Sequence, residues 1–85
     1  MTTSREIQVE AYAGHRGYES PRALYVERRR VEILDIIDRW ITEDIDQRDI
    51  KRFFTVICED GFIYKICYDD LRGKWYQLFK ERSTA

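Results

Sequence analysis

The first residues that could do chemistry form an acidic group near the middle of the chain. Glu43, Asp44, Asp46 and Asp49 carry carboxylate oxygens, which are the ligands that calcium prefers. A calcium loop also needs a glycine for its sharp turn and a bidentate glutamate at its end, and the sequence does not supply them in that order. We therefore interpret these residues as a solvated acidic loop, and we predict no metal site and no cofactor.

A second candidate is an acid–base pair, because His15 and Glu19 lie close in sequence and histidine titrates near neutral pH. Catalysis would also require a nucleophile, an oxyanion stabiliser or a metal, and none accompanies this pair. The adjacent carboxylates Asp69 and Asp70 would point to opposite sides of a strand end, and we interpret them as turn residues. The sequence therefore predicts no catalytic residue, and we expect that the protein is not an enzyme.

The thiols of Cys58 and Cys67 are the third candidate. In a hairpin they lie about four residues out of register, which separates them by roughly 13 Å at the rise of a β-strand. A disulfide cannot span that distance. We expect two buried free thiols, a pattern typical of the reducing cytoplasm, which is the location we predict.

Arginines and aromatic residues are interleaved in the first half of the chain, and β-barrel modules hold single-stranded nucleic acid with such side chains. The group comprises Arg16, Arg22, Arg28, Arg29, Arg30, Tyr12, Tyr18, Tyr25 and Trp40. The chain has a net charge of −1 and a pI of about 5.8, which argues against binding dominated by phosphate contacts. A nucleic-acid accessory domain with an Arg/Tyr surface therefore stays the alternative function, and a charged hairpin tip is the structural explanation.

Aromatic residues make up 14% of the chain, so some rings must stay near the surface of a small curved sheet. We expect this for Phe53, Phe62, Trp75 and Tyr76. An exposed aromatic patch usually marks an interface, and the filling of a small core is the competing explanation.

The element that must position all of these residues is a β-hairpin over residues 53–68, where β-branched and aromatic runs flank Asp60-Gly61. With a two-residue turn, Cys58 would lie opposite Ile63. With a three-residue loop ending in a G1 bulge, Val56 would face Tyr64, and Thr55 and Lys65 would pair on the other face. The bulged register gathers seven hydrophobic residues on one face, so we favour it: Phe54, Val56, Cys58, Phe62, Tyr64, Ile66 and Tyr68.

The remaining strands are expected at residues 6–12, 22–26 and 75–79, joined by loops at residues 13–21, 42–49 and 69–74. Glu27-Arg28-Arg29 is a poor turn by composition, although we expect a hairpin there. Residues 30–41 are ambiguous. Their apolar spacing slightly favours a helix, whereas a strand would need a β-bulge near Leu34–Asp35.

The layout resembles a set of small prokaryotic cytoplasmic proteins of unknown function. The shared residues are Ile7, Val9, Ala11, Tyr12, Gly14, Arg16, Glu19, Pro21, Val31, Ile33, Ile36, Ile37, Asp38, Arg39, Trp40, Phe54, Val56, Asp60, Gly61, Tyr64, Tyr68, Asp69 and Trp75. The resemblance implies that the stretch ending in Asp38-Arg39-Trp40 is a strand after a tight hairpin. It implies a fold layout and no activity.

We therefore predict a single small all-β domain over residues 1–85, with residues 1–5 and 81–85 frayed. Six short antiparallel strands in meander order would form a curled sheet or an SH3-like partly open barrel. The alternative is an α+β fold in which residues 30–41 are helical. No apolar run approaches the ~18 residues of a membrane span, so we expect no membrane association.

The expected function is that of a non-enzymatic interaction module that binds an unidentified protein partner or itself as a homodimer. Loops carried on a rigid sheet concentrate recognition residues, and the loop after residue 13 offers a ring, charges and an aromatic side chain. The predicted partner-binding residues are His15, Arg16, Tyr18 and Glu19 of that loop, with Arg39 and Trp40 beside it. We also expect Trp40 to be at least half buried against the central hairpin.

Overall fold

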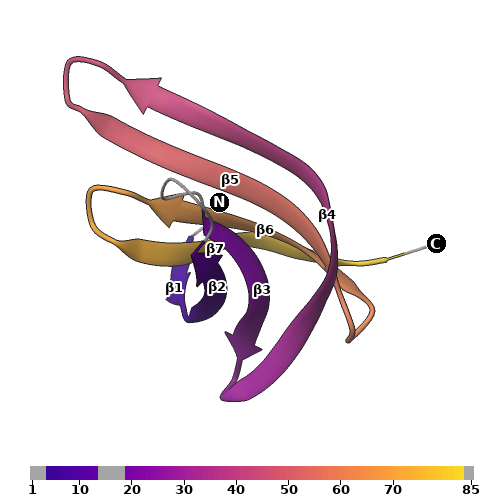
Figure 1. Ribbon diagram of the computed structural model, residues 1–85. Helices are drawn as coiled ribbons and strands as arrows, with labels where there is room; N and C mark the ends of the chain where they lie inside the picture. The colour runs from indigo at the N-terminus through magenta and orange to yellow at the C-terminus, as the bar shows by residue number, and fades with distance from the viewer. Residues whose placement is uncertain (1–3, 14–18, 84–85) are drawn as a thin grey trace.

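The computed structural model describes residues 4–13 and 19–83, and these residues form strands and turns with no helix (Figure 1). The strands are β1 (Arg5–Ile7), β2 (Val9–Ala13), β3 (Glu19–Val26), β4 (Arg29–Asp44), β5 (Asp49–Cys58), β6 (Phe62–Asp69) and β7 (Lys74–Arg82). They make one antiparallel sheet in the order β1-β7-β6-β5-β4-β3-β2. The all-β prediction is confirmed, with seven strands where we expected six.

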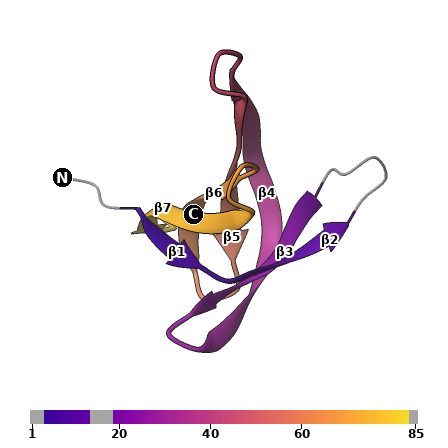
Figure 2. The same cartoon turned by 90° about the vertical axis from the view of Figure 1, so that its left-hand side faces the viewer.

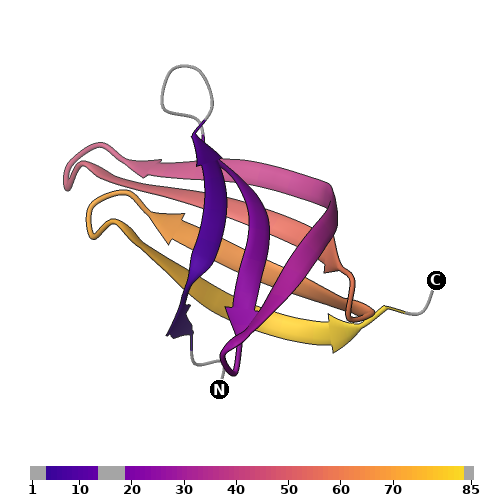
Figure 3. The ribbon, with the colours of Figure 1, turned by 60° about the horizontal axis from the view of Figure 1, so that its bottom comes forward.

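The additional strand arises because the expected first strand breaks at Gln8. β1 pairs with β7, whereas β2 pairs with β3 at the other end of the strand order. The Gln8 carbonyl accepts a hydrogen bond from the Tyr25 backbone N–H at 3.0 Å, so this carbonyl keeps a backbone partner at the break between the two strands. Because the outermost strands are consecutive in sequence, the sheet curls back on itself, and β2 and β3 cross over β5, β6 and β7 (Figure 3).

The central hairpin has the bulged register that we favoured. Val56 pairs with Tyr64, Phe54 with Ile66, and Thr55 with Lys65. The Gly61 N–H donates to the Cys58 carbonyl at 3.1 Å, and Gly61 has a φ of 83°, which closes a three-residue loop. All seven predicted side chains belong to the core cluster or pack against it, together with Leu24, Val31 and Trp75.

Residues 30–41 are a strand, so the helical alternative is wrong. The register of β4 against β5 shifts between Ile33 and Asp35 and again between Ile36 and Asp38, as two β-bulges. The first bulge lies where we predicted one. Inward positions of β4 therefore recur every three residues, at Ile33, Ile36 and Arg39, whereas their partners on β5 recur every two. This spacing imitates a helical face, which explains the ambiguity of the sequence.

Two expected loops are shorter than predicted. β4 continues to Asp44 and β5 begins at Asp49, so the acidic loop is reduced to residues 45–48. β3 already begins at Glu19, where we expected a loop up to Pro21. Glu81 and Arg82, which we expected to be frayed, pair with Ile63 and Phe62.

The turn between β3 and β4 is a two-residue hairpin turn despite its composition. Val26 pairs with Arg29, and the two residues between them have positive φ angles, 51° at Glu27 and 69° at Arg28. This combination is that of a type I′ turn, which normally selects asparagine and glycine. Gly73, near the end of the β6–β7 connection, also has a positive φ, of 66°.

Among the described residues no helix is long and apolar enough to cross a lipid bilayer.

Candidate functional site

The sheet opens between β3 and β4, which separate after a short stretch of pairing. Residues 23–26 of β3 pair with residues 29–32 of β4, but β3 pairs only with β2 before residue 23. Among the described residues, β4 pairs only with β5 from Ile33 onward. Figure 2 shows β3 and β4 diverging beyond their paired stretch. The cleft between them has a strand edge along each side.

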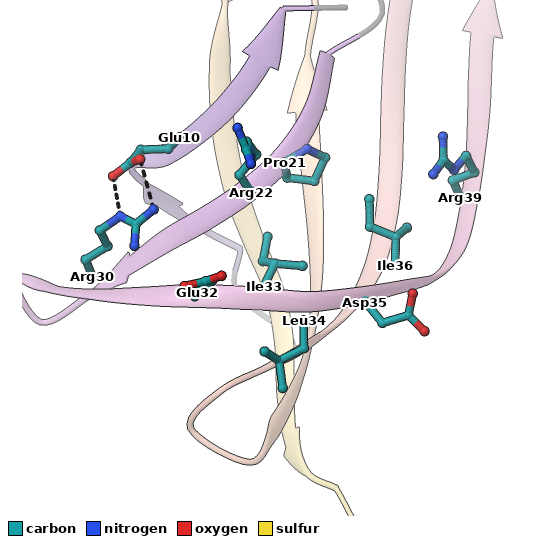
Figure 4. Close-up of a pocket in the computed structure, with 10 residues that line it drawn as sticks. All are labelled: Glu10, Pro21, Arg22, Arg30, Glu32, Ile33, Leu34, Asp35, Ile36 and Arg39. Carbon is teal, nitrogen blue, oxygen red and sulfur yellow. Dashed lines mark hydrogen bonds and ion pairs between the residues drawn. The ribbon is translucent and has the colours of Figure 1, made fainter.

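The part of the cleft nearest the β3–β4 turn, its lower part, is a polar hollow of about 560 Å³. Two of its lining residues, Arg30 of β4 and Glu10 of β2, form an ion pair across β3, with Nε 2.8 Å from Oε2, and the Tyr25 hydroxyl donates to the same oxygen at 2.6 Å. The hydrogen bond from Arg30 lowers the pKa of the Glu10 carboxyl, and the bond to Glu10 raises the pKa of the Tyr25 hydroxyl. In Figure 4, Ile33 and Ile36 point to the side of Pro21 and Arg22, whereas Leu34 points away.

The part of the cleft farther from the β3–β4 turn, its upper part, is a smaller hollow of about 350 Å³. Its lining is mostly apolar and includes two arginines. It is lined by Ser20, Arg39, Trp40, Ile41, Arg52, Phe53 and Phe54. Arg39 lines both hollows and joins them. Side chains alternate across a strand, and Arg39 pairs with the buried Phe54 whereas Trp40 pairs with Phe53. The smaller hollow therefore reaches around the edge of β4 from one face to the other.

Trp40 is held on the face of the sheet opposite to the core. Its ring stacks on Phe53 with centroids 5.2 Å apart and planes 7° from parallel, and the Lys65 ammonium lies 4.7 Å from the ring centroid. Trp40 is less than half exposed, so the expected burial against the central hairpin is confirmed. Phe53 and Lys65, which belong to the two strands of that hairpin, provide its cover.

The structure brings part of the predicted recognition site together. Arg39 and Trp40 line the same hollow as Ser20, the residue after Glu19. Glu19 itself opens β3 and its backbone pairs with Ala13. The other predicted residues, His15, Arg16 and Tyr18, lie outside the described residues.

Sequence reasoning missed the residues that complete the smaller hollow, Ile41, Arg52 and Phe54. Phe54 and Arg52 belong to β5, and their closeness to Ser20 depends on how far β3 and β4 diverge. Ile41 ends the apolar spacing of residues 30–41, yet it is 54% exposed. An isoleucine at the end of an alternating run, next to charged residues, was the available signal.

The remaining chemical groups have structural roles. Asp69 is 6% exposed, and its Oδ1 accepts the backbone N–H groups of Leu71 and Arg72, so it is the turn residue we predicted. Cys58 and Cys67 are both free and buried. Burial raises the pKa of the Cys58 thiol to about 12 and that of Cys67 to about 11, which keeps both thiols protonated and unreactive near neutral pH.

Two acidic residues at the β4–β5 turn have local partners. Asp44 Oδ1 accepts from the N–H groups of Asp46 and Gln47, and Asp49 Oδ2 lies 3.3 Å from the Lys51 ammonium. Within residues 4–13 and 19–83, no three histidine, cysteine or acidic side chains gather where they could hold a metal ion.

The surface aromatic residues differ in part from expectation. Phe53, Phe62 and Tyr76 are partly exposed, but Trp75 is only 8% exposed, so its assignment to the surface is wrong. Its ring packs between Phe54 and Tyr68, at centroid distances of 5.7 and 5.0 Å. Trp75 pairs with Ile7 and Tyr68, which both pack against the core cluster, so it takes the core face of the sheet.

No protein family, no curated protein and no solved structure matches this chain. The resemblance to small prokaryotic proteins therefore stays a prediction. The function has to be argued from the geometry of the cleft.

Proposed function

We propose that this protein is a non-enzymatic interaction module that binds an extended segment of a protein in the cleft between β3 and β4. The observation that carries the proposal is the free edge of β4, which has no partner strand on the cleft side over residues 33–44 within the described part of the chain. An unpaired strand edge offers backbone donors and acceptors to an incoming strand, and this is the basis of strand addition in peptide-binding domains.

The side chains beside this edge suit such a ligand. Strand addition takes affinity from backbone hydrogen bonds and specificity from pockets that receive alternate side chains. The smaller hollow is such a pocket, with Phe54 and Ile41 as apolar lining and the guanidinium of Arg39 at its junction with the polar hollow. A segment with an apolar side chain followed by a carboxylate would complement it.

Nucleic acid is the second candidate, because the two hollows contain three arginines, Arg22, Arg39 and Arg52, beside an aromatic ring. Neighbouring charge weakens this candidate. Arg30 is paired with Glu10, and the Arg52 guanidinium lies 3.6 Å from an Asp70 carboxylate oxygen. The whole chain is also slightly acidic. We propose the cytoplasm as its location because both thiols are free.

Site-specific photocrosslinking in a lysate of the source cells tests the proposal. A photoreactive amino acid replaces Ile41 in one variant and Arg29, at the turn below the cleft, in a matched control variant. We expect position 41 to capture a protein, a second copy included, and position 29 to capture none or different ones. The yield at position 41 should survive nuclease treatment. Equal capture at both positions, or a product that disappears with nuclease, would overturn the proposal.

A further inference from the structure

Exposed aliphatic side chains are concentrated on β4. Six large hydrophobic residues are exposed in the described part of the chain, and four of them lie on β4 or in the turn that follows it. These four are Leu34, Ile37, Ile41 and Ile45, with exposed fractions of 64%, 50%, 54% and 85%. Isolated exposed aliphatic residues need no explanation, but their concentration on one strand with a free edge, and in the turn that follows it, is typical of a contact surface.

The direction of the backbone groups at this edge follows from the hairpin register. The Cys58 carbonyl bonds toward β6, so alternation along the antiparallel strand turns the groups of Phe53 toward β4 and its partner Trp40. The groups of Arg39, Ile41 and Glu43 therefore point to the free edge. The Arg39 N–H agrees with this assignment, because it donates to its neighbour Asp38 at 2.9 Å and not to β5.

The edge is complementary to a second copy of itself in the antiparallel direction. Centred on Ile41, such pairing places Ile41 opposite Ile41 of the second copy, and Arg39 opposite Glu43 of the second copy on the same face, twice by symmetry. The regular part of this pairing runs from Asp38 to Asp44, between the second β-bulge and the turn, and Ile37 and Ile45 lie just beyond its two ends.

One pair opposes this register. Asp38 would lie opposite Asp44 of the second copy, also twice, and like charges directly opposite one another are destabilising. Asp44 Oδ1 accepts two hydrogen bonds within its own turn, from the N–H groups of Asp46 and Gln47. Asp38 Oδ1 accepts one, from the Arg39 N–H. Asp38 is therefore the residue that limits self-association.

We infer that a second copy of this chain docks on β4 by antiparallel pairing about Ile41, which makes a symmetric dimer whose sheet continues from one copy to the other. This inference rests on the proposed function and names its partner. Charge complementarity between Arg39 and Glu43 supports self-pairing over an unrelated acidic or basic strand, because each copy carries both signs at matching distances from the centre.

Sedimentation equilibrium of the full chain with charge-exchange variants tests this dimer. Arg39→Glu and Glu43→Arg should each weaken the dimer by roughly tenfold or more, since two cross-strand pairs become repulsive. The double variant should recover the affinity of the wild type. Asp38→Lys should tighten the dimer, and Arg29→Glu, outside the paired edge, is the control. Thermal melts of every variant verify that each one is folded.

A wild-type chain that stays monomeric up to millimolar concentration would overturn the dimer. Failure of the double variant to recover the affinity lost in two folded single variants would do the same. Either result leaves the proposed function intact if crosslinking at position 41 captures a different protein. Absence of any captured protein at position 41 in the lysate, with a monomer in the centrifuge, would overturn both.

Discussion

The two halves of β4 belong to different surroundings, although they are one strand. Residues 29–32 pair with β3. On the other side, the Glu32 N–H donates to the Glu59 carboxylate, and the Glu32 carbonyl accepts from the Glu59 N–H. Val31 in this half is 4% exposed. The upper half pairs with β5 alone and exposes Ile37 and Ile41. Val31, Ile33 and Ile36 therefore stabilise the fold from the core side, whereas Leu34, Ile37 and Ile41 remain exposed to a partner.

Truncation of one isoleucine in each region should give the largest difference. Ile66 has no exposed surface and lies in the core, so Ile66→Ala should lower the free energy of unfolding by about 2–5 kcal/mol. Ile41→Ala, at a site that is 54% exposed, should cost less than about 1 kcal/mol. Urea unfolding at low protein concentration measures both. Similar losses would show that the upper half of β4 is part of the core.

The two buried thiols allow a second test, through the dependence of stability on pH. Burial raises the pKa of Cys58 to about 12 and that of Cys67 to about 11, whereas an unfolded thiol ionises near pH ~8.5. Above that pH the unfolded chain loses protons that the folded chain keeps. Stability should therefore fall by up to about 1.4 kcal/mol per pH unit for each thiol, until the folded pKa is reached.

The matched variant for this test is Cys67→Ala, which should reduce the pH dependence of urea unfolding between pH 8.5 and 10.5 relative to the wild type. Cys58 contributes to the dependence that remains, and near pH 10 so does Tyr64, whose hydroxyl pKa is also raised by burial. Rapid reaction of both native thiols with a thiol reagent at pH 8 would contradict the protection that burial provides.

Trp40 lies on the face of the sheet opposite to the core, so its truncation measures how much that face contributes to stability. Stacking on Phe53 and the Lys65 ammonium over the ring each contribute on the order of 0.5–1.5 kcal/mol, so Trp40→Ala should lower stability by about 1–2 kcal/mol. Trp40→Phe keeps an aromatic ring and should recover part of the loss. A loss as large as that of Ile66→Ala would place Trp40 among the core residues.

The sequence predicted the central hairpin better than the site because the hairpin depends on local signals. Asp60-Gly61 sets the loop, and alternation then decides the register from Phe54 to Ile66. β4 was harder, since two bulges turn a period of two into a period of three. The free edge of β4 could not be predicted at all. It depends on where β3 and β4 diverge, which is a property of the curled sheet and not of either strand.

The smallest predicted effects are at two hairpin turns. The β3–β4 turn has residues unfavourable for a positive φ, whereas the β5–β6 turn has a glycine at that position. Glu27 and Arg28 hold positive φ angles of 51° and 69°, which cost side-chain-bearing residues about 1 kcal/mol or more. Glu27→Asn with Arg28→Gly supplies the preferred pair and leaves the net charge unchanged. We expect unfolding to become about 1 kcal/mol less favourable, a rise in melting temperature of roughly 4–8 °C for a domain of this size.

Gly61→Ala is the converse change. A Cβ at this position would meet nothing within 4 Å, so steric contact with neighbours adds no cost and only the φ of 83° opposes the substitution. The expected loss is about 1 kcal/mol, opposite in sign to the gain at Glu27 and Arg28. If the double variant gains nothing while Gly61→Ala is destabilising, the β3–β4 turn is not strained in solution. A gain at one turn and a loss at the other would show that backbone conformation, and not side-chain contact, sets the stability of both hairpin ends.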